Sequence, residues 1–363
     1  MSLWPVYTGT NEPHDGIAQL PPPPPWRDFD GGPVLPAPSD DTSATSPDRR
    51  HRARTYRATE NCVQLVNAAL YLRRPLLVTG PPGSGKSSLA YAVARELGLG
   101  PVLRWNITSR SALRDGLYQY DPLSRLYAAG RAATSPRAAT SPRAATSPRP
   151  DEGPGARPDE DARPDRAGVE DHLRLGPLGT ALLPYARPRV LLIDEIDKSD
   201  LDLPNDLLNI LEEGQYEIPE LVRTARHAPE AGLLADGSDD PVTVVRGRVR
   251  CRAFPFTVLT SNGEREFPPA FLRRCVTLRL RQPRDEHLEE IVRAHLGEPD
   301  AYARSLITRF LERGSGGELA TDQLLNAIYL TGAAGIDAAS RDELAQQLMP
   351  YLTQAADPGP DAL

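Results

Sequence analysis

Nine consecutive residues have the types and spacing of a loop that binds the phosphates of a nucleotide. They match the pattern G-x-x-x-x-G-K-[ST] without a mismatch. Glycines let successive backbone N–H groups turn toward an anion, Lys86 would reach the β- and γ-phosphates, and the Ser87 hydroxyl would hold Mg²⁺. The residues of this predicted phosphate loop are Gly80, Pro81, Pro82, Gly83, Ser84, Gly85, Lys86, Ser87 and Ser88.

Lysine is rare in this chain. Lys86 and Lys198 are the only lysines among 42 basic residues, and all the others are arginines. A lysine offers a compact ammonium group, whereas an arginine offers a planar fork. The lysine kept at position 86 therefore supports the prediction of a phosphate loop.

Two further apolar runs end in polar side chains that suit nucleotide hydrolysis. Residues 190–193 lead into Asp194 and Glu195. Asp194 would lie on the Mg²⁺ side of the nucleotide, and Glu195 would polarise the attacking water. Residues 256–261 lead into Asn262, which we expect beside the γ-phosphate because ligands collect at the carboxyl ends of parallel strands.

Alternating strand and helix patterns position these residues. Residues 75–79 indicate a buried strand before the loop, and residues 87–97 have the apolar spacing of a helix after it. A helical pattern at 63–72 precedes this strand, and residues 101–106 indicate a second strand. The alternation predicts an α/β fold with a parallel sheet. Further helices are predicted within residues 285–297, 300–313, 319–331 and 340–354.

Residues 80–87, 190–195 and 260–262, in this order, resemble the motifs of an AAA+ ATPase. Residues 191–198 and 203–209 resemble its MoxR branch. The resemblance implies a P-loop NTPase core with a five-stranded parallel sheet, a small α-helical lid, and ATP and Mg²⁺ bound between them. It also implies a homo-oligomeric ring, expected to be hexameric. Such a ring would remodel or activate a protein partner, for example a protein with a von Willebrand A domain.

The resemblance implies an arginine finger, a cation given to the γ-phosphate held by a neighbouring subunit. Arg273 and Arg274 lie at the corresponding place, just before a strand at 276–280, and remain alternatives. The family often adds a cationic sensor at the start of the third lid helix, but residues 318–323 contain no Arg or Lys. The lid therefore departs from the family pattern. Extra segments of the MoxR branch, among them a β-hairpin, are expected within residues 108–180 and 215–255.

The predicted domains are a Pro-rich extended arm (1–55), the AAA+ core (56–282), the lid (283–355) and a flexible tail (356–363). Three copies of Arg-Ala-Ala-Thr-Ser-Pro lie in a predicted disordered insertion at 129–169 of the core. For the arm we favour a segment lying on its own domain or a linker over a polyproline segment that docks on a partner.

Four arginines alternate with smaller residues before the third apolar run. On a strand, a side-chain period of two would project all four from one face. This face predicts either a charged, soluble edge or a contact surface for an acidic protein segment or a nucleic acid. The arginines are Arg246, Arg248, Arg250 and Arg252.

Composition favours a cytoplasmic protein. The net charge of −7 does not suggest a chain coated for nucleic acid, and three widely spaced cysteines indicate neither a disulfide framework nor a zinc site. No apolar run approaches the roughly 18 residues of a membrane span. We expect Mg²⁺-dependent ATP hydrolysis. Two alternatives remain: a nucleic-acid-stimulated motor or restriction-type NTPase subunit, and a nucleotide-gated scaffold with slow turnover. A small-molecule kinase is disfavoured, because no acceptor-binding segment is recognisable and Glu195 is suited to activating water.

Overall fold

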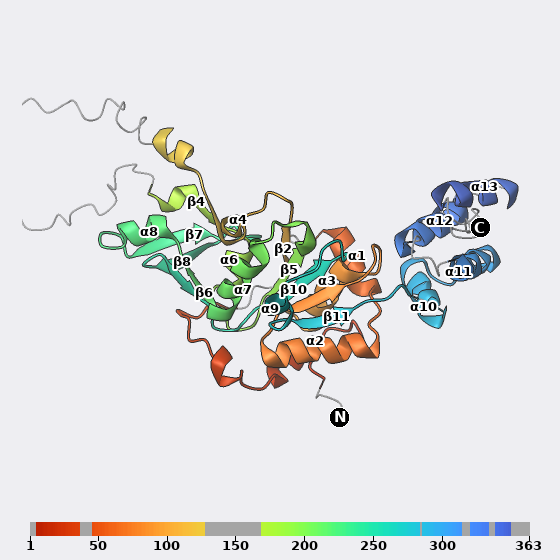
Figure 1. The fold of residues 1–363 in the computed structure, drawn as a ribbon, viewed down its shortest axis with the longest axis horizontal. Coiled ribbons are helices and arrows are strands. Elements are labelled where there is room, and N and C mark those ends of the chain that lie inside the picture. Colours follow the sequence, from red (N-terminus) through yellow and green to blue (C-terminus); the bar gives the residue numbers. More distant parts are fainter. Residues whose placement is uncertain are drawn as a thin grey trace, which may run out of the picture.

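A central parallel sheet carries the predicted motifs (Figure 1). The computed structural model describes residues 5–36, 46–127, 168–283, 285–313, 320–333 and 338–349. The strands of the central sheet are β1 (Leu76–Thr79), β2 (Leu103–Asn106), β5 (Val190–Asp194), β10 (Phe256–Ser261) and β11 (Val276–Arg279). Their order is β11-β1-β10-β5-β2, and every pairing is parallel. The predicted α/β fold with a five-stranded parallel sheet is confirmed.

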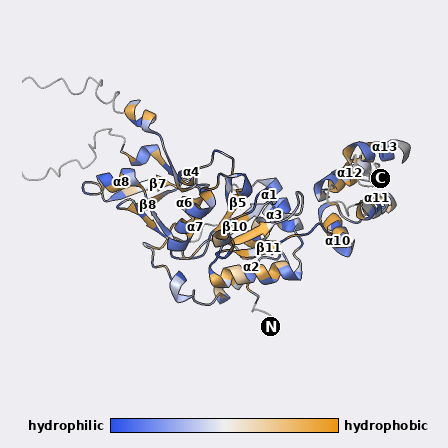
Figure 2. Cartoon of the chain, in the orientation of Figure 1, coloured by the Kyte–Doolittle hydropathy of each residue, from blue (hydrophilic) through white to orange (hydrophobic). Residues whose placement is uncertain are grey.

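Both faces of the central sheet are buried. Leu76 and Val78 pack into one hydrophobic cluster and Leu77 into the other, because successive side chains of a strand point to opposite faces. The first cluster includes residues of α2 (Glu60–Leu72) and α3 (Lys86–Glu96). Figure 2 shows hydrophobic residues gathered on the central strands. Burial on both faces explains why these strands are continuous apolar runs in the sequence.

A second sheet extends the core on the side away from the lid (Figure 1). Its strands have only three to five residues, too few for a clear alternation, and we did not predict the sheet from the sequence. They are β3 (Tyr118–Tyr120), β4 (Leu173–Leu175), β6 (Gln215–Glu217), β7 (Glu230–Leu234), β8 (Pro241–Val245) and β9 (Arg248–Arg250), in the order β3-β4-β7-β8-β9-β6. The antiparallel hairpin β7–β8 falls where the resemblance predicts one.

Short helices complete the core. They are α4 (Leu113–Leu117), α6 (Pro177–Ala181), α7 (Leu203–Glu213), α8 (Pro219–Thr224) and α9 (Pro269–Leu272), with single 3₁₀ turns at Glu170–His172 and Ile196–Lys198.

The predicted four-arginine strand face is wrong. Only Arg248 and Arg250 lie on β9, while Arg246 lies in the preceding turn with φ of 54° and Arg252 follows the strand in a bend. A left-handed residue next to Gly247 reverses the chain between β8 and β9, so the period of two begins only after the turn. Arg248 pairs with Glu217 at 2.8 Å, and Arg250 pairs with an aspartate of the N-terminal segment at 2.8 Å.

The lid is a helical unit with its own core. Its helices are α10 (Asp285–Leu296), α11 (Ala301–Arg313), α12 (Thr321–Ala333) and α13 (Ala338–Leu348), at the places that the apolar spacing predicts. Leu288, Phe310 and Leu324, from three of these helices, are buried together. Among the residues that the structure describes, no helix combines the length and the apolar character that a membrane span requires.

The N-terminal segment lies on the core. Asn67 of α2 accepts the backbone N–H groups of Val6 and Tyr7 at 2.8 and 2.9 Å, and both residues are buried. The prediction of an extended arm through residue 55 is wrong at its end, because Pro47–Thr55 forms helix α1. Ser46 caps this helix and Pro47 supplies the fixed φ of its first turn. Most of the predicted insertion (129–169) and the whole predicted tail (356–363) lie outside the described residues.

Candidate active site

The phosphate loop connects the end of β1 to the start of α3. Gly83 and Gly85 have φ of 73° and 82°, a left-handed conformation that favours glycine. A side chain would also be crowded: a Cβ on Gly85 would lie 3.2 Å from the ring of Tyr56, and a Cβ on Gly83 would lie 2.9 Å from a carboxylate oxygen of Asp322. At both positions of the loop, conformation favours glycine and the neighbours leave little room for a side chain.

The Lys86 side chain is bonded to the backbone of the phosphate loop. Its Nζ donates to the carbonyl oxygens of Gly80 and Pro81, each at 2.8 Å. Burial lowers the pKa of Lys86, and the nearby carboxylates, Asp197 first, oppose this shift. An ammonium group held by two neutral carbonyls can exchange them for a phosphate, which offers a full negative charge.

Asp194 joins the loop to the central sheet. Its Oδ1 accepts the hydroxyl groups of Ser87 and Thr260, each at 2.7 Å, and its Oδ2 accepts Arg104 at 2.8 Å. Burial by itself raises the pKa of Asp194, but the hydrogen bonds from Thr260, Ser87 and Arg104 outweigh it and hold the pKa below its usual range. Asp194 is therefore a carboxylate beside the Ser87 hydroxyl. These oxygens fit Mg²⁺, which takes one or two carboxylates together with substrate phosphates.

Glu195 follows in a left-handed backbone conformation, with φ of 62°. Such a conformation is strained for a residue with a side chain and is found at functional sites. Its backbone N–H donates to the Thr260 hydroxyl at 2.9 Å, and its carboxylate pairs with Lys198 at 2.8 Å. The two neighbouring carboxylates have different partners: Asp194 accepts Ser87, Thr260 and Arg104, whereas Glu195 pairs with Lys198.

Asp197 holds the segment that contains Asn262. This carboxylate is only 3% exposed, and its Oδ2 accepts the backbone N–H groups of Asn262, Gly263 and Glu264 at 2.9, 3.1 and 3.2 Å. The backbone of Asn262 is thereby fixed beside the 3₁₀ turn that follows Glu195.

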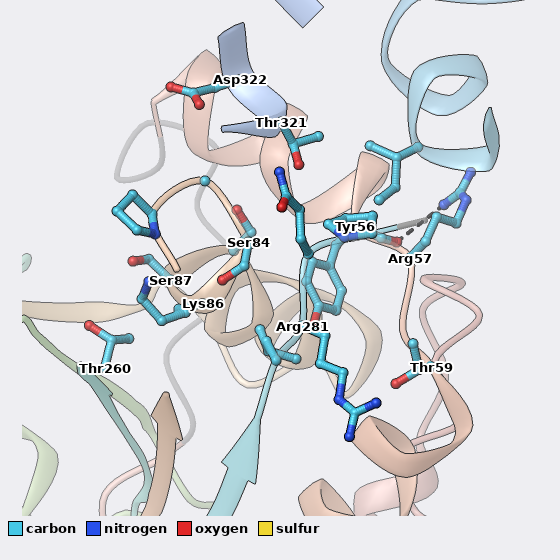
Figure 3. A pocket seen from close by; sticks show the side chains of 18 of the residues that line it. Tyr56, Arg57, Thr59, Ser84, Lys86, Ser87, Thr260, Arg281, Thr321 and Asp322 are labelled. Carbon is cyan, nitrogen blue, oxygen red and sulfur yellow. Dashed lines mark hydrogen bonds between the residues drawn. The ribbon is translucent and has the colours of Figure 1, made fainter. Parts of the chain in front are cut away.

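A cavity of about 1100 Å³ lies between the core and the lid. Figure 3 shows Lys86 and Ser87 on one side, Tyr56 in the middle, and Thr321 and Asp322 of α12 on the lid side. The volume is close to that of a site for a nucleotide-sized ligand. Predicted site residues that line it are Pro82, Gly83, Ser84, Gly85, Lys86, Ser87, Ser88, Asp194, Glu195 and Asn262, while Gly80 and Pro81 contribute the carbonyls that hold Lys86.

The structure does not bring Arg273 or Arg274 to this cavity. Both follow α9, and Arg274 pairs with Glu212 of α7 at 2.6 Å. Arg273 is exposed, and its Nε donates to the carbonyl oxygen of Pro269 at 3.3 Å. A role for either arginine at a nucleotide therefore requires the site of another subunit.

Sequence reasoning missed the roles of Arg104, Asp197 and Thr260. Thr260 precedes Asn262 by two residues and belongs to the motif at residues 260–262, so its place near the site could have been predicted from the sequence. Arg104 is the one charged residue inside the short strand β2, and its position opposite Leu192 of β5 became visible only from strand pairing. Asp197 follows Glu195 by two residues, but nothing in the sequence indicates that its partners are the backbone groups of 262–264.

The parallel sheet, the loop at the end of β1 and the carboxylates at the end of β5 define a P-loop domain of the AAA+ type. The comparison with protein families agrees: the profile described as "AAA domain (dynein-related subfamily)" matches residues 75–275. The match spans more than half of the 363 residues, and the chain belongs to this family.

Comparison with curated proteins gives no match. Among solved structures, NtrX from Brucella abortus in complex with ADP is similar, with a TM-score of 0.36 and 14% identity over 85% of this chain. The same protein in complex with ATP gives a TM-score of 0.37 and 14% identity over 79% of this chain. In both comparisons this chain spans about half of the NtrX chain, namely 55%.

Proposed function

We propose that this chain is a Mg²⁺-dependent ATPase. The observation that supports this most strongly is the continuous set of contacts from Ser87 through Asp194 to Thr260 and the backbone of Glu195. It links the group that would hold Mg²⁺ to the residue that would activate water. Bound Mg²⁺ would neutralise charge on the phosphates, with Ser87 and Asp194 as its protein-side contacts.

In this proposal Lys86 and the N–H groups of the phosphate loop bind the β- and γ-phosphates. Glu195 accepts the proton of the attacking water, and Asn262 orients the γ-phosphate. The pair between Glu195 and Lys198 does not oppose this role. Their side chains are 43% and 41% exposed, and water competes for an ion pair this exposed, so Glu195 exchanges its partner easily.

We assign the arginine finger to Arg273. Arg274 already neutralises Glu212 within its own chain, whereas the described hydrogen bond of the Arg273 side chain is to a backbone carbonyl. A cation that is exposed and pairs with no acidic side chain among the described residues suits the γ-phosphate of a neighbour. The active site is then completed only in a ring, for which we propose six subunits.

For the work driven by hydrolysis we propose remodelling of a protein partner, as in the MoxR branch, with a von Willebrand A-domain protein as the model partner. A nucleic-acid motor is less well supported, because Arg248 and Arg250 are paired with Glu217 and Asp30. The cytoplasm remains the proposed location, and the three free, buried cysteines support a reducing compartment.

The test is phosphate release and ATP binding by three proteins: wild type, Lys86→Ala and Glu195→Gln. We expect Lys86→Ala to lose binding. Glu195→Gln should keep binding and lose hydrolysis by on the order of 100-fold or more, as expected for a general base. A wild type that binds no ATP, or a Glu195→Gln variant that hydrolyses at the wild-type rate, contradicts the proposal.

A mixing experiment tests the ring and the finger together. Glu195→Gln lacks the base of its own site, and Arg273→Ala lacks the cation for its neighbour, so each is expected to be inactive alone. In a mixed ring, the intact Glu195 of one subunit meets the intact Arg273 of another, and part of the activity should return. Arg274→Ala serves as the matched control and should remain active alone. No recovery in the mixture, with sedimentation showing mixed assemblies, would refute the assignment.

A further inference from the structure

One stretch of the N-terminal segment, residues 21–26, is ordered although it is largely exposed. Before it, the carbonyl oxygen of Pro21 accepts Arg73 Nη2 at 2.7 Å. After it, Arg27 is only 7% exposed, and its Nη1 donates to a backbone carbonyl of α7 at 2.8 Å. Five consecutive prolines restrict their own φ angles, and Pro24, with φ of −55° and ψ of 145°, is close to the polyproline II conformation. The core therefore presents a rigid proline-rich stretch to its surroundings.

An apolar and basic surface surrounds this stretch. Trp26 is 73% exposed, more than any other large apolar side chain of the described residues, and Leu72 and Leu272 are 42% and 40% exposed. Arg74 donates to the carbonyl oxygen of Arg273 at 3.2 Å, which brings the two leucine–arginine pairs together. Aromatic side chains and arginines are enriched in protein interfaces. We call this surface the strap face; its members are residues 21–26, Leu72, Arg73, Arg74, Leu272 and Arg273.

The proposed finger connects the strap face to the proposed ring. Arg273 would reach the γ-phosphate in the site of a neighbouring subunit, so the residues beside it would meet the same neighbour. The cavity that holds this phosphate lies between the neighbour's core and its lid. The strap face would therefore lie against a second copy of the chain.

The lid carries a groove that suits a proline-rich ligand. Its volume is about 340 Å³, and residues of α10, α11 and α12 line it. Two of these residues are tyrosines: Tyr302 is partly buried, and Tyr329 is 66% exposed. Polyproline II segments dock into grooves lined by aromatic side chains. The groove thus has the chemistry that residues 21–26 require.

The charges of the two surfaces are complementary. The strap face contains three arginines, whereas Glu298 and Asp300 line the groove and are exposed. Glu298 pairs with Arg293 at 2.7 Å, but its side chain is 71% exposed, so it stays accessible to a further cation. Attraction between the surfaces would orient the two subunits as they meet.

The stretch does not reach the groove of its own chain. Figure 1 shows the N-terminal segment (red) beneath the core and the lid apart from it, at one end of the molecule. The hydrogen bonds of Pro21 and Arg27 hold both ends of the stretch on the core. The groove that it can enter is therefore that of a second copy.

We propose that residues 21–26 of one subunit dock into the groove between Tyr302 and Tyr329 on the lid of a neighbouring subunit. Trp26 is the anchor of this contact, and the prolines lie against the tyrosines. Because the stretch is already ordered, docking costs little conformational entropy. The contact joins the core of one subunit to the lid of the next, beside the site that Arg273 completes. The inference rests on the proposed ring.

Sedimentation velocity with Mg²⁺-ATP measures assembly, in the Glu195→Gln background so that ATP persists. Trp26→Ala and Tyr329→Ala should each raise the Kd of assembly by about 30-fold, as truncation of an interface hot spot does. The double variant should lose little more than either single variant, because both remove the same contact. Tyr127→Ala is the matched control and should assemble like the parent protein, since Tyr127 is 65% exposed but belongs to neither surface.

Cross-linking tests the contact directly. Trp26→Cys and Tyr329→Cys proteins are mixed with Mg²⁺-ATP and treated with a short bismaleimide, while the three native cysteines are buried. A covalent dimer should form in the mixture and in neither protein alone.

The outcomes separate this docking from the proposals on which it rests. Assembly that neither alanine variant weakens, or a mixture that assembles without forming the covalent dimer, overturns the docking and leaves the ring and the ATPase intact. In that case residues 21–26 are left for a different protein. A parent protein that binds ATP but stays monomeric overturns the ring and the docking together, and leaves the proposed ATP binding intact.

Discussion

Replacing Asp197 by alanine should both destabilise the core and disorder the segment that carries Asn262. One carboxylate oxygen of Asp197 accepts three backbone N–H groups, and its surroundings are dry because the residue is 3% exposed. In Asp197→Ala, the N–H groups of Asn262, Gly263 and Glu264 lose this common acceptor. Asp197 is also the carboxylate that most opposes the effect of burial on Lys86.

The size of the effect follows from the three contacts. A hydrogen bond to a charged group contributes about 1.5–3 kcal/mol, but three bonds that share one oxygen are not additive, and two of them are longer than 3.0 Å. We therefore expect Asp197→Ala to lower the free energy of unfolding by about 3–4 kcal/mol. Asp197→Asn keeps a neutral acceptor oxygen and should lose only about 1–2 kcal/mol.

Urea unfolding, followed by circular dichroism, measures these differences through the midpoint at constant m-value. Asp239→Ala, which removes an exposed aspartate of the β7–β8 turn, is the control and should stay within about 0.5 kcal/mol of wild type. Without urea, where the Asp197→Ala protein is folded, its rate of phosphate release should still be lower than that of the wild type. The reason is that the backbone of Asn262 has lost its hydrogen bond to Asp197. An Asp197→Ala protein as stable as the control would refute the role assigned to this carboxylate.

Three further predictions concern ionisation. Arg104→Met should raise the pKa of Asp194, because it removes a hydrogen bond and a positive charge. A carboxylate with a lowered pKa stabilises the fold above its unfolded pKa, and this stabilisation is lost as the pH falls through its folded pKa. Acid unfolding of the variant should therefore begin at a higher pH than that of the wild type. Burial, with His51 and Arg57 nearby, lowers the pKa of His295 from 6.5 to about 4, so stability should increase with pH across that interval, and the thermal midpoint of His295→Phe should depend less on pH there. Burial raises the pKa of all three thiols, and a thiol reagent should label them slowly in the native protein and rapidly in concentrated urea; the values are about 11 for Cys62 and about 12 for Cys251 and Cys275.

Much of the fold was predictable because its signals are local. Apolar runs located the five central strands, and helical apolar spacing located the four lid helices. Burial on one or both faces of an element produces a pattern of apolar residues within a short stretch of sequence. The six short strands of the second sheet carry no such signal. Their pairing depends on neighbours that are distant in sequence, for example β6 with β9.

The turn at Arg246 illustrates the limit of periodicity. The alternation of arginine with other residues is real in the sequence, but a left-handed turn at Arg246 and Gly247 breaks the strand before the pattern can place four side chains on one face. A pattern of period two predicts a face only where the backbone is extended throughout. Likewise, the polar residues 47–55 gave no apolar stripe, and helix α1 forms where its Ala53 and Thr55 become buried against the rest of the chain.

By itself the sequence identified the candidate site residues that are contiguous along the chain: the loop from Gly80 to Ser88, the carboxylates Asp194 and Glu195, and the amide of Asn262. These motifs are recognisable because the bonds that shape them connect residues a few positions apart. Only the tertiary structure decided what lies opposite them. It joined Asp194 to Arg104, placed Asp197 under the backbone of 262–264, and set the buried hydroxyl of Thr321 on the lid above Gly83. These pairings depend on strand order and helix packing, which arise from the burial of the whole chain and leave no local pattern.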